Sequence, residues 1–355
     1  MKDQPILVTG GCGFVGRHVV RYLLLRGSPR AIWLVDNLFS GLVPEVWLPS
    51  RFTRRATSPT CTILSDGEIT ITFLRQDIRQ FLGECLRNAN EPSLPRFGDV
   101  IHLASVVGGR GLIDGDPLLV ATDMAIDTDL FHWARTVKPD RLLYASSSAA
   151  YPVHLQGESD AVALSEDFID FGDRMGLPDM TYGWSKLTGE YLARIASRHY
   201  GLHTCCVRPF SGYGEDQEPV YPVPAIAERA ARKEDPLTVW GTGHQGRDFV
   251  HIDDCVELMF RVLGEVSDGS AVNIGSGVLT TFIQVAELFA EISGYSPTVE
   301  PLVDKPVGVQ NRYANTSLVQ KRFGWSPKIS LREGFERVFE AARNPTSKFS
   351  FLDKT

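Results

Sequence analysis

The fold of this chain is decided by residues 6–16, Ile-Leu-Val-Thr-Gly-Gly-Cys-Gly-Phe-Val-Gly. Its first four residues predict a buried strand, and the glycine-spaced turn that follows opens into an apolar helix near 14–26. Gly10 and Gly13 can adopt backbone angles that a Cβ would forbid, and Gly16 lets the helix pack closely on the strand. Because the free amides at the start of that helix attract an anion, the turn is suited to a pyrophosphate.

An acidic residue at the end of the next strand indicates which dinucleotide fits. Apolar residues 31–35 predict this second strand, and Asp36 ends it 20 residues after Gly16. A carboxylate at that position can bind both ribose hydroxyls and would repel a 2′-phosphate. Because Asn37 and residues 38–39 supply no arginine for such a phosphate, the sequence predicts NAD rather than NADP as the cofactor.

The composition limits the possible classes of protein. With 355 residues, 43% of them hydrophobic, the chain is long enough for one large α/β unit or for two packed domains with a sizeable core. A formal net charge of −7 disfavours nucleic acid as a partner, and the six cysteines, without metal-ligand spacing, are interpreted as reduced core thiols. No apolar run reaches the roughly 20 residues of a membrane span, and the first strand leaves no room for a signal peptide before it. We therefore expect a cytoplasmic enzyme with no metal and no membrane partner.

Predicted strands and helices alternate along the chain, which is typical of a parallel, doubly wound sheet. Residues 40–69, rich in Pro, Ser, Thr and Arg, interrupt the alternation and are predicted to be a surface insertion. The prolines of 209–224 mark a boundary, so we expect a cofactor domain at 1–208, with a return near 245–275, and a substrate domain at 209–355. The predicted strands are 6–9, 31–35, 70–74, 99–103, 141–146, 204–208 and 271–274, and the predicted helices are 14–26, 117–136, 182–200, 224–233, 253–264, 281–292 and 331–342.

Polar residues that could carry chemistry follow the fifth predicted strand of the alternation. Residues 144–151 read Tyr-Ala-Ser-Ser-Ser-Ala-Ala-Tyr, and Tyr182 and Lys186 come later on a predicted helix. Residues four apart share one helix face, so the ammonium can lie beside the phenol and lower its pKa from about 10 toward working pH. The serines lie at the carboxyl end of a sheet strand, where open α/β folds bind ligands. Tyr182 is therefore a candidate general base.

These segments resemble the extended short-chain dehydrogenase/reductase family, and within it the NAD-dependent nucleotide-sugar epimerases and dehydratases. The resemblance covers nearly the whole chain and implies a Rossmann-type doubly wound sheet with a smaller C-terminal α/β substrate domain. It implies that Tyr182, Lys186 and Ser147 are catalytic. The matching motifs lie at 9–16, 36–37, 76–78, 102–104, 146–151, 182–186, 208–209, 246–254 and 273–275.

The same resemblance implies two sets of binding residues. Arg247 would clamp the substrate diphosphate, a role suited to a planar fork of donors. The other substrate-binding residues would be Gly108, Arg110, Ser148 and Arg312. The cofactor-binding residues would be Gly10, Gly13, Phe14, Val15, Gly16, Asp36, Asn37, Asp77, Ile78, Leu103, Ala104, Ser105, Tyr182, Lys186 and Pro209.

Subgroups of the family differ just after the active serine. Segments 107–113 and 308–312 are similar to GDP-mannose 3,5-epimerases, which favours a GDP-linked mannose or heptose as the substrate. That subgroup uses a cysteine where this chain has Ala149, and the lysine that partners it has no counterpart in 215–223. The 4,6-dehydratases have an Asp-Glu pair where this chain has Ser148 and Ala149, and residues 147–151 most resemble the 4-epimerases.

We therefore expect oxidation at C4 of a nucleotide sugar, with a 4-epimerase that works through a 4-keto intermediate as the first hypothesis. The alternatives are a net 4-dehydrogenase that releases the ketone, a 3,5-epimerase, and a non-catalytic nucleotide-binding protein. Helices 117–136 and 182–200 resemble the family's two-helix dimer face, so a homodimer is expected. Asp123, Asp127 and Asp129 are interpreted as a solvated helix face or a subunit contact.

Overall fold

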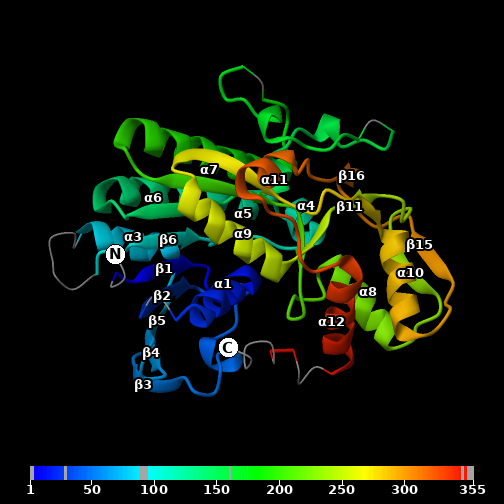
Figure 1. The fold of residues 1–355 in the computed structure, drawn as a ribbon, viewed down its shortest axis with the longest axis horizontal. Helices are drawn as coiled ribbons and strands as arrows, with labels where there is room; N and C mark the ends of the chain where they lie inside the picture. Colours follow the sequence, from blue (N-terminus) through cyan, green and yellow to red (C-terminus); the bar gives the residue numbers. More distant parts are fainter. Residues whose placement is uncertain are drawn as a thin grey trace.

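The largest sheet has nine strands among the residues that the computed structural model describes, which are 4–27, 30–87, 95–159, 161–173, 175–344 and 348–349. Seven of these strands are parallel, and they surround β1, which begins the cofactor turn (Figure 1). The doubly wound order expected from the sequence is therefore present. From one edge to the other the strands are β13 (Asp268–Ile274), β8 (Thr204–Pro209), β7 (Arg141–Ala145), β6 (Asp99–His102), β1 (Ile6–Thr9), β2 (Ala31–Asp36), β5 (Thr70–Arg75), β4 (Cys61–Ser65) and β3 (Thr53–Thr57).

Helices cover both faces of this sheet because the strands are apolar on both sides. On one face α1 (Phe14–Leu25) and α9 (Ile252–Glu265) contribute Leu23 and Val256 to a core shared with Leu34. On the other face α3 (Ile78–Arg87), α6 (Thr122–Val137) and α7 (Met180–Tyr200) pack together, with Leu130 and Ala193 fully buried. The carboxyl ends of the parallel strands are left for ligands.

The segment 40–69 differs from the predicted surface insertion. It contains α2 (Pro44–Trp47) and the hairpin of β3 and β4, which runs antiparallel to β5 and extends the sheet. Trp47 is 1% exposed, packs into the sheet's core and donates to the carbonyl of Leu42 at 2.9 Å. The hairpin was not predicted because β3 is Thr-Arg-Arg-Ala-Thr, which has no apolar stripe.

The remaining strands form three small sheets, and Figure 1 shows three of these strands, β11, β15 and β16, at the opposite end of the molecule from β3 and β4. Helices α8 (Pro222–Ala231), α10 (Phe282–Ser293) and α12 (Leu331–Arg343) pack on one aromatic core, in which the rings of Phe289 and Phe335 stack at 4.6 Å. The small sheets pair β10 (Leu237–Trp240) with β15 (Val299–Leu302), β12 (Phe249–His251) with β9 (Ser211–Tyr213), and β11 (Gly246–Arg247) with β14 (Thr280–Thr281) and β16 (Asn311–Arg312).

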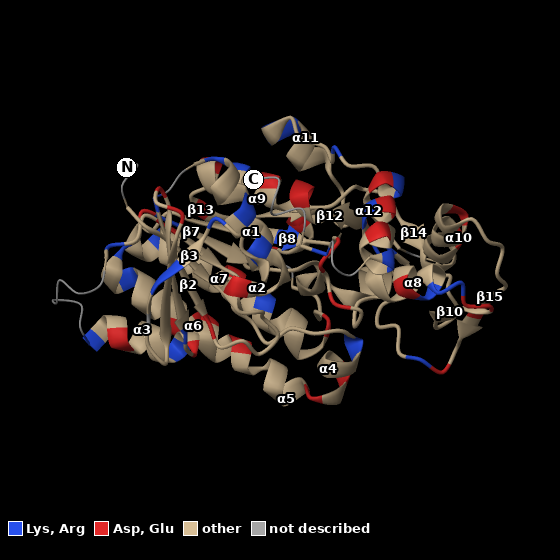
Figure 2. Ribbon diagram, turned by 90° about the horizontal axis from the view of Figure 1, so that it is seen from below, with Lys and Arg blue, Asp and Glu red and all other residues tan. Residues whose placement is uncertain are grey.

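Helix boundaries depart from the prediction mainly at 117–136. This segment is two helices, α5 (Pro117–Val120) and α6, and α4 (Arg110–Gly115) precedes them. A last helix, α11 (Ser317–Phe323), follows the small sheets. Figure 2 shows acidic and basic residues interspersed along α12, where Arg337 pairs with Glu333 one turn away. Within the described ranges, no helix is long and apolar enough to cross a membrane.

Candidate active site

The turn after β1 requires glycine at Gly10 and Gly16. Gly13, which was expected to need backbone angles that a Cβ forbids, has instead a φ of −71° and room for a Cβ. Gly10 has a φ of +66°, and a Cβ there would lie 2.8 Å from the backbone nitrogen of Ala104. A Cβ at Gly16 would lie 2.5 Å from the carbonyl oxygen of Gly10. Gly13 begins α1 without a side-chain cap, so the first amides of the helix, at Phe14 and Val15, face outward. This cradle fits the pyrophosphate of a dinucleotide.

Asp36 is fixed beside this turn by two backbone amides. Its Oδ2 accepts from the amide of Cys12 at 2.9 Å, and its Oδ1 accepts from that of Leu38 at 2.8 Å. Burial raises the pKa of Asp36 above its ordinary value, and these two amides oppose the increase. The structure therefore places the Asp36 carboxylate at the end of β2, directly beside the glycine turn.

A cavity of about 420 Å³ opens next to Asp36, on the side of β5 and of the hairpin formed by β3 and β4. The predicted cofactor residues Asn37 and Asp77 line it, and Ile78, predicted with Asp77 to flank the adenine, is buried at the start of α3. Thr60 and Arg75 also line this cavity, and sequence reasoning missed both. Neither follows a recognisable motif, since Thr60 comes from the unpredicted hairpin and Arg75 ends β5 opposite Asp36.

The residues predicted after β6 and β8 also lie along the carboxyl edge of the sheet. The amides of Leu103 and Ala104 both donate to the Thr9 hydroxyl at 3.2 Å, which holds the end of β6 against β1. Ser105 donates to Asp123, and Pro209 ends β8 on the same edge. The predicted cofactor residues are thus brought together from β1, β2, β6 and β8.

Tyr182 and Lys186 lie on one face of α7, as their spacing predicts. The Lys186 ammonium lies 5.6 Å from the centroid of the Tyr182 ring and 5.4 Å from that of Tyr144. Lys186 is only 4% exposed. Ser147 follows β7 and accepts from the amide of Ala149 at 3.1 Å. Ser147, Ala149 and Tyr182 line one cavity of about 790 Å³, a volume suited to a small-molecule ligand.

Asp123 and Asp127, which were expected on a solvated helix face or at a subunit contact, are instead buried near Lys186. Asp123 and Asp127 are each 1% exposed. Asp123 accepts from the amide of Val106 at 2.6 Å, and Asp127 accepts from the Tyr144 hydroxyl at 2.6 Å. Burial lowers the pKa of Lys186, but the negative charges of Tyr182, Asp123 and Asp127 raise it above its ordinary value. The ammonium is therefore kept charged in a buried place, where it can stabilise a phenolate.

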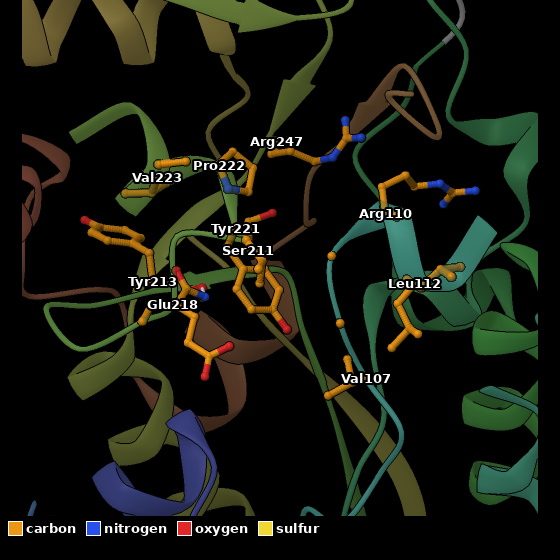
Figure 3. A pocket seen from close by; sticks show the side chains of 18 of the residues that line it. Val107, Arg110, Leu112, Ser211, Tyr213, Glu218, Tyr221, Pro222, Val223 and Arg247 are labelled. Carbon is orange, nitrogen blue, oxygen red and sulfur yellow. Dashed lines mark hydrogen bonds between the residues drawn. The ribbon is translucent and has the colours of Figure 1, made fainter. Parts of the chain in front are cut away.

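Four arginines line the same cavity, and three of them, Arg110, Arg247 and Arg312, are predicted substrate-binding residues. Arg247 donates through its Nη atoms to four backbone carbonyls, among them those of Gln310 at 3.0 Å and Val307 at 2.8 Å. Carbonyls do not neutralise the charge, and burial, followed by the nearby Arg312, lowers the pKa of Arg247 to about 9. Figure 3 shows Arg247 and Arg110 at the same end of the cavity.

Arg110 and Arg312 share one carboxylate, Asp179, which sequence reasoning missed. Arg110 donates to Asp179 at 3.0 Å and to Asp114, and Arg312 donates to Asp179 at 2.9 Å. Burial opposes ionisation, yet the two guanidiniums hold the pKa of Asp179 below its ordinary value. Asp179 lies three residues before Tyr182, at the start of α7, and its position could have been recognised as an N-terminal acid.

Two glycines of the segment 108–111 lie too close to neighbouring residues to carry a side chain. A Cβ at Gly109 would lie 2.7 Å from the carbonyl oxygen of Val220, and one at Gly108 would meet Leu112 at 2.8 Å. Ser148 is buried in the short 3₁₀ turn after β7 and lines the cavity. The predicted substrate-binding residues thus border one cavity, although they come from four separate segments. The end of this cavity next to the small sheets is lined by Arg229, Trp240, Phe249, Phe282 and Pro306.

Known proteins are similar to this chain over nearly its whole length. The chain is 28% identical to GDP-mannose 3,5-epimerase of Arabidopsis thaliana over 95% of this chain and 82% of that protein. It superposes on the structure of a UDP-glucose 4-epimerase of Thermotoga maritima with UDP-glucose, with a TM-score of 0.77, 27% identity, and 96% and 99% of the two chains covered. A UDP-glucuronic acid 4-epimerase of Bacillus cereus, in complex with UDP-glucuronic acid and NAD, gives a TM-score of 0.76 at 25% identity over 96% and 99%.

A family model provides the assignment that these similarities suggest. The model of the NAD-dependent epimerase/dehydratase family matches residues 6–275, which contain the glycine cradle, Asp36, Ser147, Tyr182 and Lys186. The solved relatives have the same Rossmann-type fold, so the predicted fold class is confirmed. The chain is therefore an enzyme of the NAD-dependent epimerase/dehydratase family, which acts on nucleotide sugars, and its cofactor is NAD.

Proposed function

We propose that the enzyme oxidises C4 of a nucleotide sugar and then reduces the ketone from its other face, so that the net reaction is 4-epimerisation. One observation carries this proposal. Ser147 and Tyr182 line the same cavity as Arg110, Arg247 and Arg312, so a sugar and its diphosphate fit side by side in it. The buried ammonium of Lys186 lies directly behind the Tyr182 ring.

The roles follow from this placement. Tyr182 removes the proton of the 4-hydroxyl, and Ser147 donates to the same oxygen as it becomes a carbonyl. Lys186 stabilises the Tyr182 phenolate through its charge, with Asp123 and Asp127 keeping that charge in place. NAD supplies the acceptor for the hydride that leaves C4. In the return step Tyr182 gives its proton back to the oxygen, and the sugar regains a hydride at C4.

The wall next to the serines supports C4 chemistry over proton transfer at a neighbouring carbon. Ala149 stands at the position where the 3,5-epimerases are expected to have a cysteine, and it is 2% exposed in the cavity wall. An alanine cannot shuttle a proton. The 3,5-epimerase nevertheless stays an alternative, because a relative of that name is among the similar proteins. A net 4-dehydrogenase and a non-catalytic nucleotide-binding protein are the other two.

The base of the substrate is proposed to be guanine, in a GDP-linked mannose or heptose. The two segments that resemble GDP-mannose 3,5-epimerases, 107–113 and 308–312, meet at the cavity, where a Cβ on Gly308 would lie 3.0 Å from an Nη atom of Arg110. The cavity end next to the small sheets has aromatic and proline side chains suited to a flat base. Arg229 donates through Nη2 to the carbonyl of Thr238 at 2.9 Å, and its other Nη atom is proposed to donate to an acceptor of guanine.

A homodimer through α7 and the neighbouring helices is proposed as the assembly. Trp184 and Tyr191, seven residues apart on α7, are 38% and 47% exposed, and Leu118 on neighbouring α5 is 81% exposed. Such a stripe fits a self-complementary contact between two copies. Light scattering should give a dimer, Trp184→Glu should weaken it, and a monomeric native chain would contradict the proposal.

Two further expectations stay proposals. We propose that residues 1–208, with the returning segment 245–275, act as the cofactor domain and that 209–355 act as the substrate domain. A cytoplasmic location is proposed for the same reasons that the sequence suggested it. Limited proteolysis with and without NAD, followed by mass spectrometry, would test the domain boundary, because the first cleavages should fall near the proposed boundary at 208–209.

The first experiment incubates the purified enzyme with GDP-mannose, GDP-manno-heptose, UDP-glucose and UDP-glucuronate, with and without added NAD. Absorbance follows NADH, and NMR in deuterated water follows the sugar protons. Inversion at C4 without net NADH is the expected result. NADH formed in step with a 4-keto product would establish the dehydrogenase instead, and exchange of H3 or H5 with solvent would establish the 3,5-epimerase.

A Tyr182→Phe variant tests whether the protein is a catalyst at all. The variant should lose at least about 100-fold in kcat, because general acid–base catalysis typically contributes that much or more. Tyr200→Phe, which alters an exposed phenol at the end of the same helix, is the matched control and should keep full activity. Full activity or full biological effect of Tyr182→Phe would favour the non-catalytic alternative.

A further inference from the structure

A second phenol, that of Tyr221, borders the cavity and has no role in the proposed reaction. Tyr221 is the N-cap residue of α8, followed by Pro222, and its amide donates to the carbonyl of Glu218 at 3.1 Å. Because proline fixes its own φ and restricts the residue before it, the backbone of Tyr221 is held in one conformation. Figure 3 shows Tyr221 beside Ser211, with Val107 on the other side of the cavity.

The Tyr221 hydroxyl makes no hydrogen bond with the part of the chain that the structure describes, although the side chain is partly buried. Other tyrosines of this protein show what a satisfied phenol looks like. The Tyr151 hydroxyl donates to Asn273 at 2.7 Å, and that of Tyr295 donates to the carbonyl of Glu234 at 3.1 Å. Since tyrosine hydroxyls in sheltered places usually find a partner, the Tyr221 hydroxyl is available to a ligand in the cavity.

The electrostatic environment of Tyr221 favours its protonated form. Burial raises the pKa of Tyr221, and the negative charge of an ionised Tyr182 raises it further, followed by that of Glu218. Tyr221 therefore stays protonated when Tyr182 loses its proton.

We propose that the Tyr221 hydroxyl donates to an oxygen of the sugar on a carbon other than C4, and that it helps to set which hexose the enzyme accepts. The inference rests on the proposed function, since it assumes that a nucleotide sugar occupies the cavity. Tyr182 and Ser147 both serve the oxygen on C4. Tyr221 comes from the loop before α8 and contacts the sugar from the side of the small sheets. The ligand part concerned is the sugar, not the base or the diphosphate.

Removing one hydroxyl tests this inference by comparing ligands that differ only in the sugar. In Tyr221→Phe, the affinity for the nucleotide sugar that proves to be the substrate should fall about tenfold, the size of one good hydrogen bond. The affinity for the matching nucleoside diphosphate and for NAD should stay as in the native enzyme. Calorimetry measures all three ligands, and Tyr200→Phe, an exposed phenol far along α7, is the control.

The kinetic readout separates a sugar contact from a structural role. Tyr221→Phe should raise KM about tenfold for the native substrate and less for its deoxy analogue that lacks the contacted hydroxyl, with an unchanged unfolding temperature. The inference would be overturned if the affinities for the nucleotide sugar and for the nucleoside diphosphate fell equally, or if neither affinity fell. If NAD binds to the native enzyme but no nucleotide sugar does, the proposed function fails, and the inference fails with it.

Discussion

A methyl group added at Gly16 should displace the glycine turn after β1 from the start of α1. In Gly16→Ala the new Cβ would lie 2.5 Å from the carbonyl oxygen of Gly10 and 2.6 Å from the carbonyl carbon of Gly11. Favourable carbon contacts are about 3.5–4.0 Å, so backbone must move by about 1 Å. Neither neighbour is the end of a flexible side chain, and overpacking of this kind costs about 1–3 kcal/mol.

The expected result for Gly16→Ala combines two opposing contributions. Alanine is favoured over glycine inside a helix by about 1 kcal/mol, which offsets part of the overpacking. The net loss of unfolding free energy should therefore be about 0–2 kcal/mol. The amides of Phe14 and Val15 move with the turn, so NAD affinity should fall about tenfold or more, equivalent to at least about 1.4 kcal/mol.

The control for this variant is Gly264→Ala in α9, where an added Cβ would meet nothing within 4 Å. It should be as stable as the native enzyme or up to about 1 kcal/mol more stable, with unchanged NAD affinity. Urea unfolding and calorimetric titration with NAD measure both variants. If Gly16→Ala bound NAD as tightly as Gly264→Ala does, the turn would not be the pyrophosphate cradle.

Three other variants or conditions test the interior. Glu190→Gln removes the negative charge of a buried carboxylate whose two oxygens both accept from Arg208. The free energy of unfolding, measured with urea, should fall by about 3 kcal/mol, and a fall of less than about 1 kcal/mol would contradict the pairing. Burial lowers the pKa of His18, but the ion pairs with Asp216 and Asp253 raise it to about 9. The stabilisation of the fold by the charged imidazole is therefore fully present below pH 6.5 and is lost as the pH rises through 9, and a His18→Gln variant should lose that pH dependence. Lys186→Met should lower kcat at least about 100-fold and leave nucleoside diphosphate affinity unchanged, and a native kcat would exclude the proposed role.

Local patterns made the centre of the fold predictable. The apolar strand, the spaced glycines and Asp36 specify their own backbone geometry within a stretch of about thirty residues. The placement of Tyr182 and Lys186 on one face followed from helical periodicity alone. In each case the structure is determined by residues close together in the sequence, and the parallel sheet then fixes where their functional ends meet.

The missed features depend on contacts between distant segments. The acids Asp123 and Asp127 have the pattern of a solvated face, and only Ser105, Tyr144 and the charge of Lys186 explain their burial. Asp179 meets Arg312 across 133 residues of sequence, so no local spacing indicates the pair. The β3 and β4 hairpin lacks apolar alternation in its outer strand, because an edge strand at the surface is not required to bury both faces.

The two amides that hold Asp36 have a consequence for redesign of the cofactor preference. A change of this residue to a small neutral one, the usual first step toward a phosphorylated dinucleotide, would also release the amides of Cys12 and Leu38. Cys12 belongs to the glycine turn itself, so selectivity and loop geometry are tied to one side chain. An engineer would have to supply a replacement acceptor for both amides, and asparagine, with its single carbonyl oxygen, can serve only one of them.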